Sequence, residues 1–319
     1  MRLLVGTSGW SYDSWVGRFY PESYRENRRD WLEYYTRFFS TVEVASTSFQ
    51  IPPRKVVDSW IRKTSTLDSF EFSLVIPHNI SHHLLGAGKM DRIRKGLNQF
   101  EEEVMAPLYL NDRLGMVLLE LSPFFEYSKK TLHRLVEVLE FFKYLSYNYG
   151  VEFLDKSWLN SNHDGLRDNV RYHLKERGIA LCMVDGENFP FIPDTHSEEL
   201  CLKLYGRNKL AWKKAKQHHV PSSELFDYRY SESELEGIAT RLERYQGKRL
   251  RAYFKNHEGA QAVEDARSLE RLFGLEDKDG HHQQEGIESD SDEVLELEGQ
   301  DELPQRSSRE RQTHFEDFQ

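Results

Sequence analysis

Short apolar segments recur along residues 2–256 and alternate with longer segments whose apolar residues repeat at helical spacing. Each short segment carries β-branched or aromatic residues and ends in a polar or turn-forming group, as β-strands do. Strands that alternate with helices form parallel sheets, and eight of them predict closure into a TIM-like (β/α)8 barrel. The eight expected strands are "RLLVGTS" (2–8), "TVEVAST" (41–47), "FEFSLVIP" (70–77), "LGMVLLEL" (114–121), "YGVEFLD" (149–155), "IALCMVD" (179–185), "LCLKLYG" (200–206) and "RLRAYFKN" (249–256).

Helical patterns fill most of the intervals between these strands. The link "GENFPFIPDTHSEE" between the sixth and seventh strands has no such pattern, so we expect one helix to be missing or reduced there. An open doubly wound sheet is the alternative architecture, but no Gly-x-Gly-x-x-Gly sequence follows any strand to support nucleotide binding in it. The expected helices span 29–39, 53–64, 91–109, 128–145, 165–178, 231–245 and 260–273.

Acidic residues are concentrated at the C-terminal end of the chain. Residues 276–319 hold 15 Asp and Glu against 4 Lys and Arg, whereas the whole 319-residue chain has a formal charge of −10. The preceding residues are therefore close to neutral and exert no overall attraction on nucleic acid or anionic membranes. Because large apolar groups are few after residue 275, we expect a barrel domain over 1–275 and a disordered acidic tail over 276–319.

Cysteine usage and the lengths of the apolar runs bear on where the protein works. Cys182 and Cys201 each lie within an apolar run, and buried reduced thiols explain them better than a disulfide. The N-terminal apolar run is too short for a signal peptide, and no window approaches the roughly 20 apolar residues of a membrane span. We therefore expect a cytoplasmic protein that makes no membrane contact.

In a barrel of this kind, catalytic and binding groups lie at the carboxyl ends of the strands and in the loops that follow. An ionised carboxylate in an apolar strand is costly unless it is paired with a cation. The candidate cations for this pairing, on neighbouring strands, are Lys203, Arg207 and Lys255. The acidic groups at these ends form either a structural ion-pair network or a functional site in which a desolvated carboxylate transfers protons. The candidate catalytic residues are Glu43, Glu152 and Asp185.

Aromatic, amide and cationic side chains in the same loops are the candidate substrate-binding groups. Gly9 and Gly17 allow the first loop to turn over the barrel mouth, so that its aromatics form a wall or simply cover the core. Aromatic side chains stack on bases, and an arginine binds a phosphate bidentately, which predicts an anionic small molecule or a nucleic-acid fragment as the ligand. The candidate binding residues are Trp10, Tyr12, Trp158, Arg207, Asn208, Lys255 and Asn256.

The segment "HNISHH" raises the question of a metal site. His78, His82 and His83 lie on one loop, but zinc and iron sites usually add a carboxylate or another ligand from a different element, which Glu120 or Asp185 would have to supply. Without such a partner, loop histidines are hydrogen-bonded or solvated. We therefore expect no metal site, and the sequence identifies no cofactor.

Five ordered segments carry a resemblance to a known family: "GTSGWSYDSWVGRFYP", "TVEVASTSF" leading into "PPRKVVDSW", "VEFLDKSW", "LYGRN…W" and "YFKNHEGAQAVEDA". In this order and spacing they resemble the YecE-like family, also called domain of unknown function 72 (DUF72), over roughly residues 3 to 273. The resemblance implies a TIM-like barrel and no established biochemical role. The positions that match the family are Ser8, Gly9, Trp10, Tyr12, Trp15, Gly17, Phe19, Glu43, Pro77, His82, Glu152, Trp158, Asp185, Gly206, Arg207 and Asn256.

The chain departs from the pattern that this resemblance implies. The family tends to carry lysine at the position of Val75 and arginine at that of Leu154. It tends to carry arginine, histidine and asparagine at the positions of Lys203, Tyr205 and Lys255. If the family is catalytic, these differences indicate that this member has changed its substrate or lost the reaction.

Two classes of function fit these observations. The first is a hydrolase or lyase for a phosphate-bearing substrate, with Glu152 and Asp185 as acid or base and Arg207 and Lys255 as anion-binding groups. The second is a non-catalytic module that binds an anionic or aromatic ligand in the same pocket, or a scaffold. The acidic tail is either a solvated segment or a contact for a basic partner, with "HFEDFQ" as a docking peptide.

Overall fold

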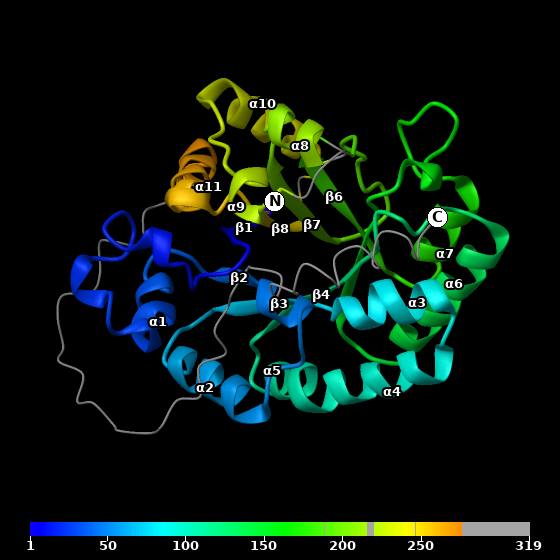
Figure 1. The fold of residues 1–319 in the computed structure, drawn as a ribbon, viewed down its shortest axis with the longest axis horizontal. Coiled ribbons are helices and arrows are strands. Elements are labelled where there is room, and N and C mark those ends of the chain that lie inside the picture. Colours follow the sequence, from blue (N-terminus) through cyan, green and yellow to red (C-terminus); the bar gives the residue numbers. More distant parts are fainter. Residues whose placement is uncertain (188, 216–219, 246, 276–319) are drawn as a thin grey trace, which may run out of the picture.

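The computed structural model describes residues 1–187, 189–215, 220–245 and 247–275. Its eight strands are parallel and follow the order β1-β8-β7-β6-β5-β4-β3-β2, which confirms the predicted TIM-like barrel (Figure 1). Within the described part of the chain, β1 and β2 share no ladder and meet through one bridge between Ser8 and Glu43. The strands are β1 Arg2–Thr7, β2 Thr41–Val44, β3 Glu71–Val75, β4 Leu114–Glu120, β5 Asn148–Glu152, β6 Ala180–Gly186, β7 Glu199–Gly206 and β8 Arg249–Phe254.

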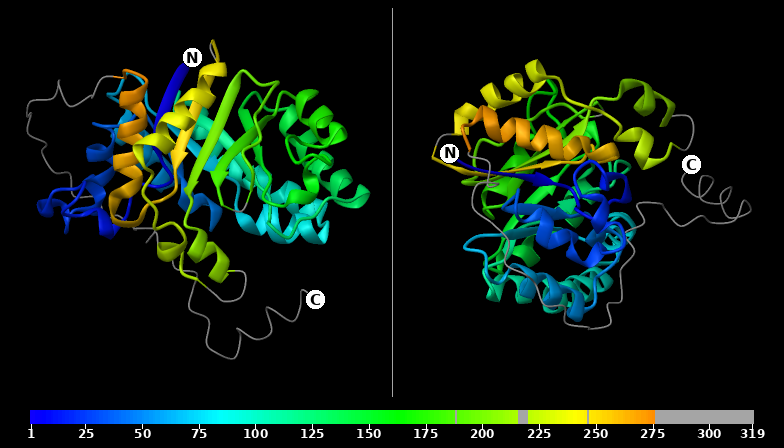
Figure 2. Two further views of the ribbon diagram at one scale, coloured as in Figure 1. Left: turned by 90° about the horizontal axis from the view of Figure 1, so that it is seen from above. Right: turned by 90° about the vertical axis from the view of Figure 1, so that its left-hand side faces the viewer.

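Helices surround the strands on the outside of the barrel (Figures 1 and 2). As expected, no helix lies between β6 and β7 among the described residues. The expected helix over 91–109 is divided by a π-helical turn, Glu101–Met105, just before Pro107, which has no backbone N–H to donate. The helices are α1 Trp31–Tyr35, α2 Arg54–Thr64, α3 Leu85–Ala87, α4 Met90–Phe100, α5 Ala106–Leu110, α6 Lys129–Lys143, α7 Asp168–Lys175, α8 Lys209–Ala215, α9 Ser222–Leu225, α10 Glu232–Leu242 and α11 Gln261–Leu272.

The inside of the barrel holds an apolar layer between two charged layers. Successive residues of a strand point to opposite faces, so every second residue faces the barrel axis. Cys182 and Cys201 are buried free thiols whose Sγ atoms lie 3.4 Å apart across β6 and β7, as the prediction of reduced thiols requires. The apolar layer consists of Met116, Leu118, Ala180, Cys182, Cys201 and Tyr253.

The aromatic segment after β1 is packed into the structure. Gly9 and Gly17 adopt φ values of 87° and 81°, the left-handed region that favours glycine. Trp15 is fully buried and donates from Nε1 to the His257 carbonyl oxygen at 2.7 Å. Tyr20 stacks on Trp31 with 4.8 Å between ring centroids. The segment thereby ties the loop after β1 to the loop after β8.

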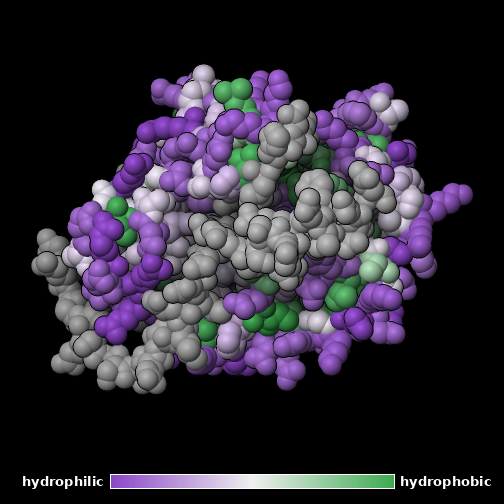
Figure 3. All heavy atoms as spheres, in the orientation of Figure 1, coloured by the Kyte–Doolittle hydropathy of each residue, from purple (hydrophilic) through white to green (hydrophobic). Residues whose placement is uncertain are grey.

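The outer surface in view is mostly hydrophilic, with hydrophobic side chains in small separate patches (Figure 3). In the described part of the chain, no helix is long and apolar enough to span a membrane. The prediction of a disordered tail concerns residues 276–319, which lie outside the described residues.

Candidate functional site

A fully buried lysine at the carboxyl end of the barrel contacts three glutamates. Lys203 Nζ on β7 lies 3.2 Å from Glu43 Oε2 on β2, 3.0 Å from Glu120 Oε2 on β4 and 3.0 Å from Glu152 Oε2 on β5. Tyr205 donates from its hydroxyl to Glu152 Oε1 at 2.5 Å. We call Lys203 and the three glutamates the mouth cluster. Four strands converge on it because their inward positions fall at one level of the barrel.

Burial and neighbouring charges shift the pKa values in the mouth cluster in different directions. Burial raises the pKa of Glu152, and Lys203 only partly opposes this effect. Burial also acts to raise the pKa of Glu120, but Lys203, Lys255 and His78 outweigh it and hold this pKa well below its ordinary value. The surrounding glutamates likewise outweigh burial and raise the pKa of Lys203. Two carboxyl groups whose pKa values are driven apart are suited to acid and base roles.

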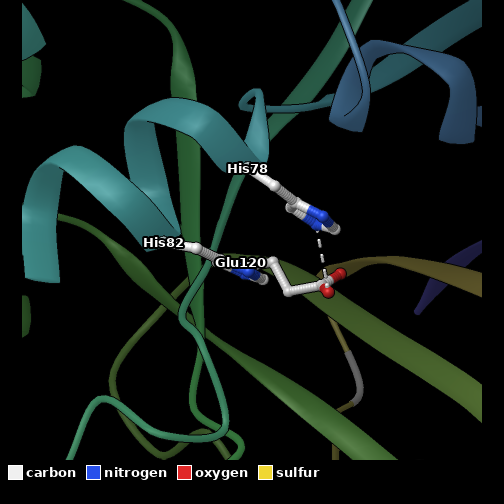
Figure 4. Close-up of side chains that lie close together, drawn as sticks. All are labelled: His78, His82 and Glu120. Carbon is white, nitrogen blue, oxygen red and sulfur yellow. Dashed lines mark ion pairs between the residues drawn. The ribbon is translucent and has the colours of Figure 1, made fainter. Parts of the chain in front are cut away.

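Two histidines lie beside the Glu120 carboxylate. His78 directly precedes the π-helical turn Asn79–Leu84, and His82 follows four residues later, so the two rings stack with centroids 4.0 Å apart (Figure 4). His78 Nε2 is 3.3 Å from Glu120 Oε1, close enough for an ion pair but not aligned for a hydrogen bond. Burial, followed by repulsion from His78, lowers the pKa of His82 to about 4, so this ring is neutral at neutral pH.

Asp185, the third predicted catalytic carboxylate, is engaged in a separate network. Arg207 donates from Nε and Nη2 to the two Asp185 oxygens at 2.9 and 2.7 Å, and from Nη1 to Glu234 at 2.9 Å. Tyr230 donates its hydroxyl to Asp185 at 3.0 Å. Bidentate pairing is the strong form of this interaction. Asp185 and Arg207 therefore contact each other, as predicted for an ion-pair network.

The remaining predicted cation, Lys255, follows β8. Its Nζ lies 5.1 Å from the centroid of Tyr205 and 5.6 Å from that of Phe226, within cation–π distance of both rings. Its charge also acts on Glu120 and Glu152. Within the part of the chain that the structure describes, Lys255 forms no ion pair with a carboxylate at direct contact distance. This side chain is therefore available to an anion at the mouth.

A family model described as "Protein of unknown function DUF72" matches residues 4–288. The chain belongs to the DUF72 family. The UPF0759 protein YunF of Bacillus subtilis (strain 168) is 22% identical to this DUF72 chain in an alignment of 288 residues that covers 86% of the chain and 95% of that relative.

Two crystal structures of DUF72 proteins share the fold. The protein from Thermotoga maritima MSB8 is 26% identical with a TM-score of 0.71, covering 86% of this chain and 100% of that one. The protein from Enterococcus faecalis V583 is 20% identical with a TM-score of 0.71, covering 86% and 96%. The predicted family is thus confirmed, and its description names no activity.

The aromatic candidates of this DUF72 chain make packing contacts. Trp10 lies edge-on to Trp60 with centroids 5.8 Å apart. Tyr12 stacks on His257 at 4.5 Å. Trp158 is fully buried and donates from Nε1 to the Phe125 carbonyl oxygen at 2.5 Å. Their predicted roles in substrate binding remain predictions.

The amide candidates hold loops together. Asn208 donates to the carbonyl oxygens of Glu224 and Asp227 at 3.1 and 2.9 Å. Asn256 is fully buried and donates to Asp265 Oδ2 at 2.7 Å. A cavity of about 680 Å³ adjoins Arg207 and Asn208 and is also lined by Lys209 and Glu234. Binding by either amide therefore remains a prediction.

Sequence reasoning identified the mouth cluster of this DUF72 protein only in part, because it named Lys203 solely as an ion-pair partner for strand-end carboxylates. Glu120 and Lys203 stood at the right strand ends, but neither was placed among the catalytic or binding residues. The signal was present, because a lysine in the apolar run "LCLKLYG" needs buried carboxylates, and "LLEL" supplies one on another strand.

Proposed function

We propose that this protein is a hydrolase or lyase that acts on a phosphate-bearing or nucleic-acid-derived substrate at the carboxyl end of the barrel. The observation that carries the proposal is the convergence of Glu43, Glu120 and Glu152 on the single cation of Lys203. General acid–base catalysis requires carboxyl groups held at fixed positions in a site from which bulk water is excluded. The barrel supplies both conditions at the end where such folds do their chemistry.

In this proposal the members of the mouth cluster have different roles. Glu152 moves the proton, because burial raises the pKa of its carboxyl group and a hydrogen bond from Tyr205 to its Oε1 fixes its position. Glu43 positions Lys203, since its other oxygen accepts a hydrogen bond from Ser8 at 2.5 Å. Asp185 acts through Arg207 and is a positioning residue for the loop after β7.

Lys255 is the anion-binding group in this proposal. Arg207, the other candidate, already directs its guanidinium at Asp185 and Glu234. Lys255 instead faces the rings of Tyr205 and Phe226, and its charge acts on the mouth cluster. A phosphate on Lys255 would therefore hold the rest of the substrate next to Glu152.

The alternative is a non-catalytic module that binds the same ligands, and one observation favours it. The side chains of Lys203, Glu43 and Glu152 have 0% exposure, so a substrate atom reaches them only if the mouth opens. A ligand bound at Lys255 without opening the cluster would be held but not converted.

A ligand screen on the full chain tests the proposal. Phosphate-bearing metabolites and short oligonucleotides would be tested for thermal stabilisation, with and without divalent metals. Losing a hydrogen bond to a charged group costs roughly 1.5–3 kcal/mol, so Lys255→Ala should weaken binding of a hit about 10- to 100-fold. Lys175→Ala, an exposed lysine of α7, is the matched control and should bind like the wild type.

Turnover of a hit then separates the two alternatives. Glu152→Gln should lower kcat by about 10²- to 10⁴-fold if Glu152 transfers the proton. Binding that depends on Lys255 with no turnover would support the binding module. Stabilisation by no phosphate-bearing compound, or equal binding by Lys255→Ala and the wild type, would refute the anion site.

A further inference from the structure

We propose that His78, His82 and Glu120 bind a divalent first-row transition-metal ion of the Zn²⁺ type at the mouth of the barrel. The inference goes beyond the proposed function and does not depend on it, because a metal can be held here whether or not the protein is an enzyme. The sequence analysis favoured hydrogen-bonded or solvated histidines over a metal site, whereas the geometry supports the metal site.

The first argument is the arrangement of the three donor atoms. The histidines are four residues apart on one helical turn, the spacing that presents two imidazoles on the same face. The candidate ligand atoms of the three residues all lie within 4.8 Å of one another. His78 Nε2 and Glu120 Oε1 are 3.3 Å apart, close to the roughly 3.0–3.4 Å between neighbouring ligands whose distances to the metal are about 2.1 Å.

The second argument is that one ring nitrogen of each histidine is buried and makes no hydrogen bond. The Nε2 atoms of both His78 and His82 are inaccessible to solvent, and neither makes a hydrogen bond with any described residue. Buried polar atoms normally have hydrogen-bond partners, so two such nitrogens side by side need an explanation. The two rings and the Glu120 carboxylate lie close together (Figure 4), and a metal ion bound among them would satisfy both nitrogens at once.

The third argument is the charge of the mouth cluster. Three glutamates surround one lysine, so the fully ionised cluster carries two more negative than positive charges. Buried charge is costly unless it is compensated. A divalent cation beside Glu120 supplies the missing positive charge, whereas neutral histidines alone do not.

The fourth argument concerns the orientation of the ligands. Lys203 contacts Glu120 Oε2, which leaves Oε1 directed at the histidines. Lys203 thus holds the Glu120 ligand in place without binding the ion itself, as outer-shell groups of metal sites do.

The donor set indicates the class of metal. Imidazole suits Zn²⁺, Fe²⁺, Co²⁺ and Ni²⁺, whereas Mg²⁺ and Ca²⁺ prefer oxygen ligands throughout. Three protein ligands leave at least one coordination position open, as in catalytic rather than structural zinc sites. His78 retains 30% exposure of its side chain, so an ion can approach from the mouth.

Metal binding by the full chain, stripped of metal with a chelator, tests this inference directly. Zn²⁺ would be titrated by calorimetry, and Co²⁺ would report on its ligands through visible absorption; neither readout needs a substrate. His82→Ala should weaken Zn²⁺ binding by more than the roughly 10- to 100-fold that loss of an outer-shell partner costs. The matched control is His83→Ala, because His83 is the exposed neighbour on the same turn.

Each outcome bears on the inference. Binding by the wild type and His83→Ala that is lost in both His82→Ala and Glu120→Gln supports the site. Thermal unfolding would show whether Glu120→Gln folds. If it does not, His82→Ala still tests the site. Equal binding by the wild type and His82→Ala, or no Zn²⁺ binding at neutral pH, would overturn it. Because no phosphate ligand is present, this failure is distinct from failure of the proposed function.

Discussion

The two charged layers inside the barrel are built alike but balanced differently. At the amino end, Arg251 donates to Glu71 and Glu199, each at 2.5 Å, and Arg249 contacts Glu71 at 2.9 Å. Two arginines therefore face two glutamates there. At the carboxyl end, Lys203 alone faces three glutamates.

This difference shows that the barrel fold itself does not require an excess of negative charge inside. Both layers are filled by inward residues of parallel strands, so the barrel itself permits a balanced set of charges. Removing ions from water is costly, and an excess of one sign adds to that cost. The unbalanced layer lies at the end that carries function in barrels of this type, and we interpret its excess negative charge as retained for a ligand.

Removing the only cation of the mouth cluster should have the largest effect. Lys203→Met leaves three buried carboxylates unpaired and should cost about 3–5 kcal/mol of unfolding free energy at pH 7. Lys203→Arg, which keeps a cation at this position, should keep the protein folded. Urea unfolding at pH 7 and pH 5 would measure both variants.

The amino-end counterpart, Arg251→Met, should cost less because Arg249 still contacts Glu71. The stability lost in Lys203→Met should be smaller at pH 5 than at pH 7. Unpaired buried glutamates have raised pKa values in the folded variant, so they are more easily protonated at pH 5 and destabilise the fold less there. Equal losses for the two variants at both pH values would contradict the comparison.

A matched pair of Glu→Gln variants should lose unequal amounts of stability at the two ends. Glu71→Gln leaves two arginines without their shared carboxylate and should cost about 3 kcal/mol. Glu43→Gln lowers the excess charge at the mouth, and its amide can accept from Lys203 through the oxygen while its NH2 group donates to Ser8 Oγ. It should therefore change the stability of the metal-free protein by about 1 kcal/mol or less. Chemical denaturation after chelation would show this, and a similar loss in both variants would count against the charge imbalance.

The titration of Asp265 also contributes to the pH dependence of stability and must be distinguished from that of the mouth cluster. Asp265 on α11 lies outside the barrel, and burial raises its pKa to about 6 despite hydrogen bonds from Tyr230 and Asn256. Because the pKa of Asp265 is raised in the folded state, protonated Asp265 stabilises the fold. This stabilisation is fully present below about pH 4 and is lost as pH rises through about 6.

Replacing Asp265 should therefore flatten the pH dependence. Asp265→Asn should remove about 2 kcal/mol of the stability difference between pH 4 and pH 7, since one pKa unit corresponds to about 1.4 kcal/mol. The remaining slope would then report on the mouth cluster. A slope identical to that of the wild type would show that Asp265 does not titrate in this range.

The fold could be predicted because each strand is a continuous apolar run ending in polar residues. "FEFSLVIP" and "LGMVLLEL" correspond closely to β3 and β4 for this reason. The short helices α3, α8 and α9 were missed, since three to seven residues do not establish a helical period. The break before Pro107 was overlooked because the apolar pattern continues through it.

The site could be predicted only in part, because its contacts depend on strand register. Glu43 and Glu152 were identified from their strands, but their meeting at Lys203 requires four strands to place their inward residues at one level. The burial of Trp158 and Asn256 could not be predicted either. A loop position does not reveal whether a side chain is exposed, and both are fully buried.

The pairing of β1 with β8 has a consequence for how the chain folds. Arg2 is aligned with Arg249, so the barrel closes only when the two ends of the described domain meet. Local contacts within β3 to β6 can form early, but this pairing carries a large loop-closure entropy and slows folding. During synthesis β1 emerges long before its partner, and until β8 arrives its edge is exposed to other chains.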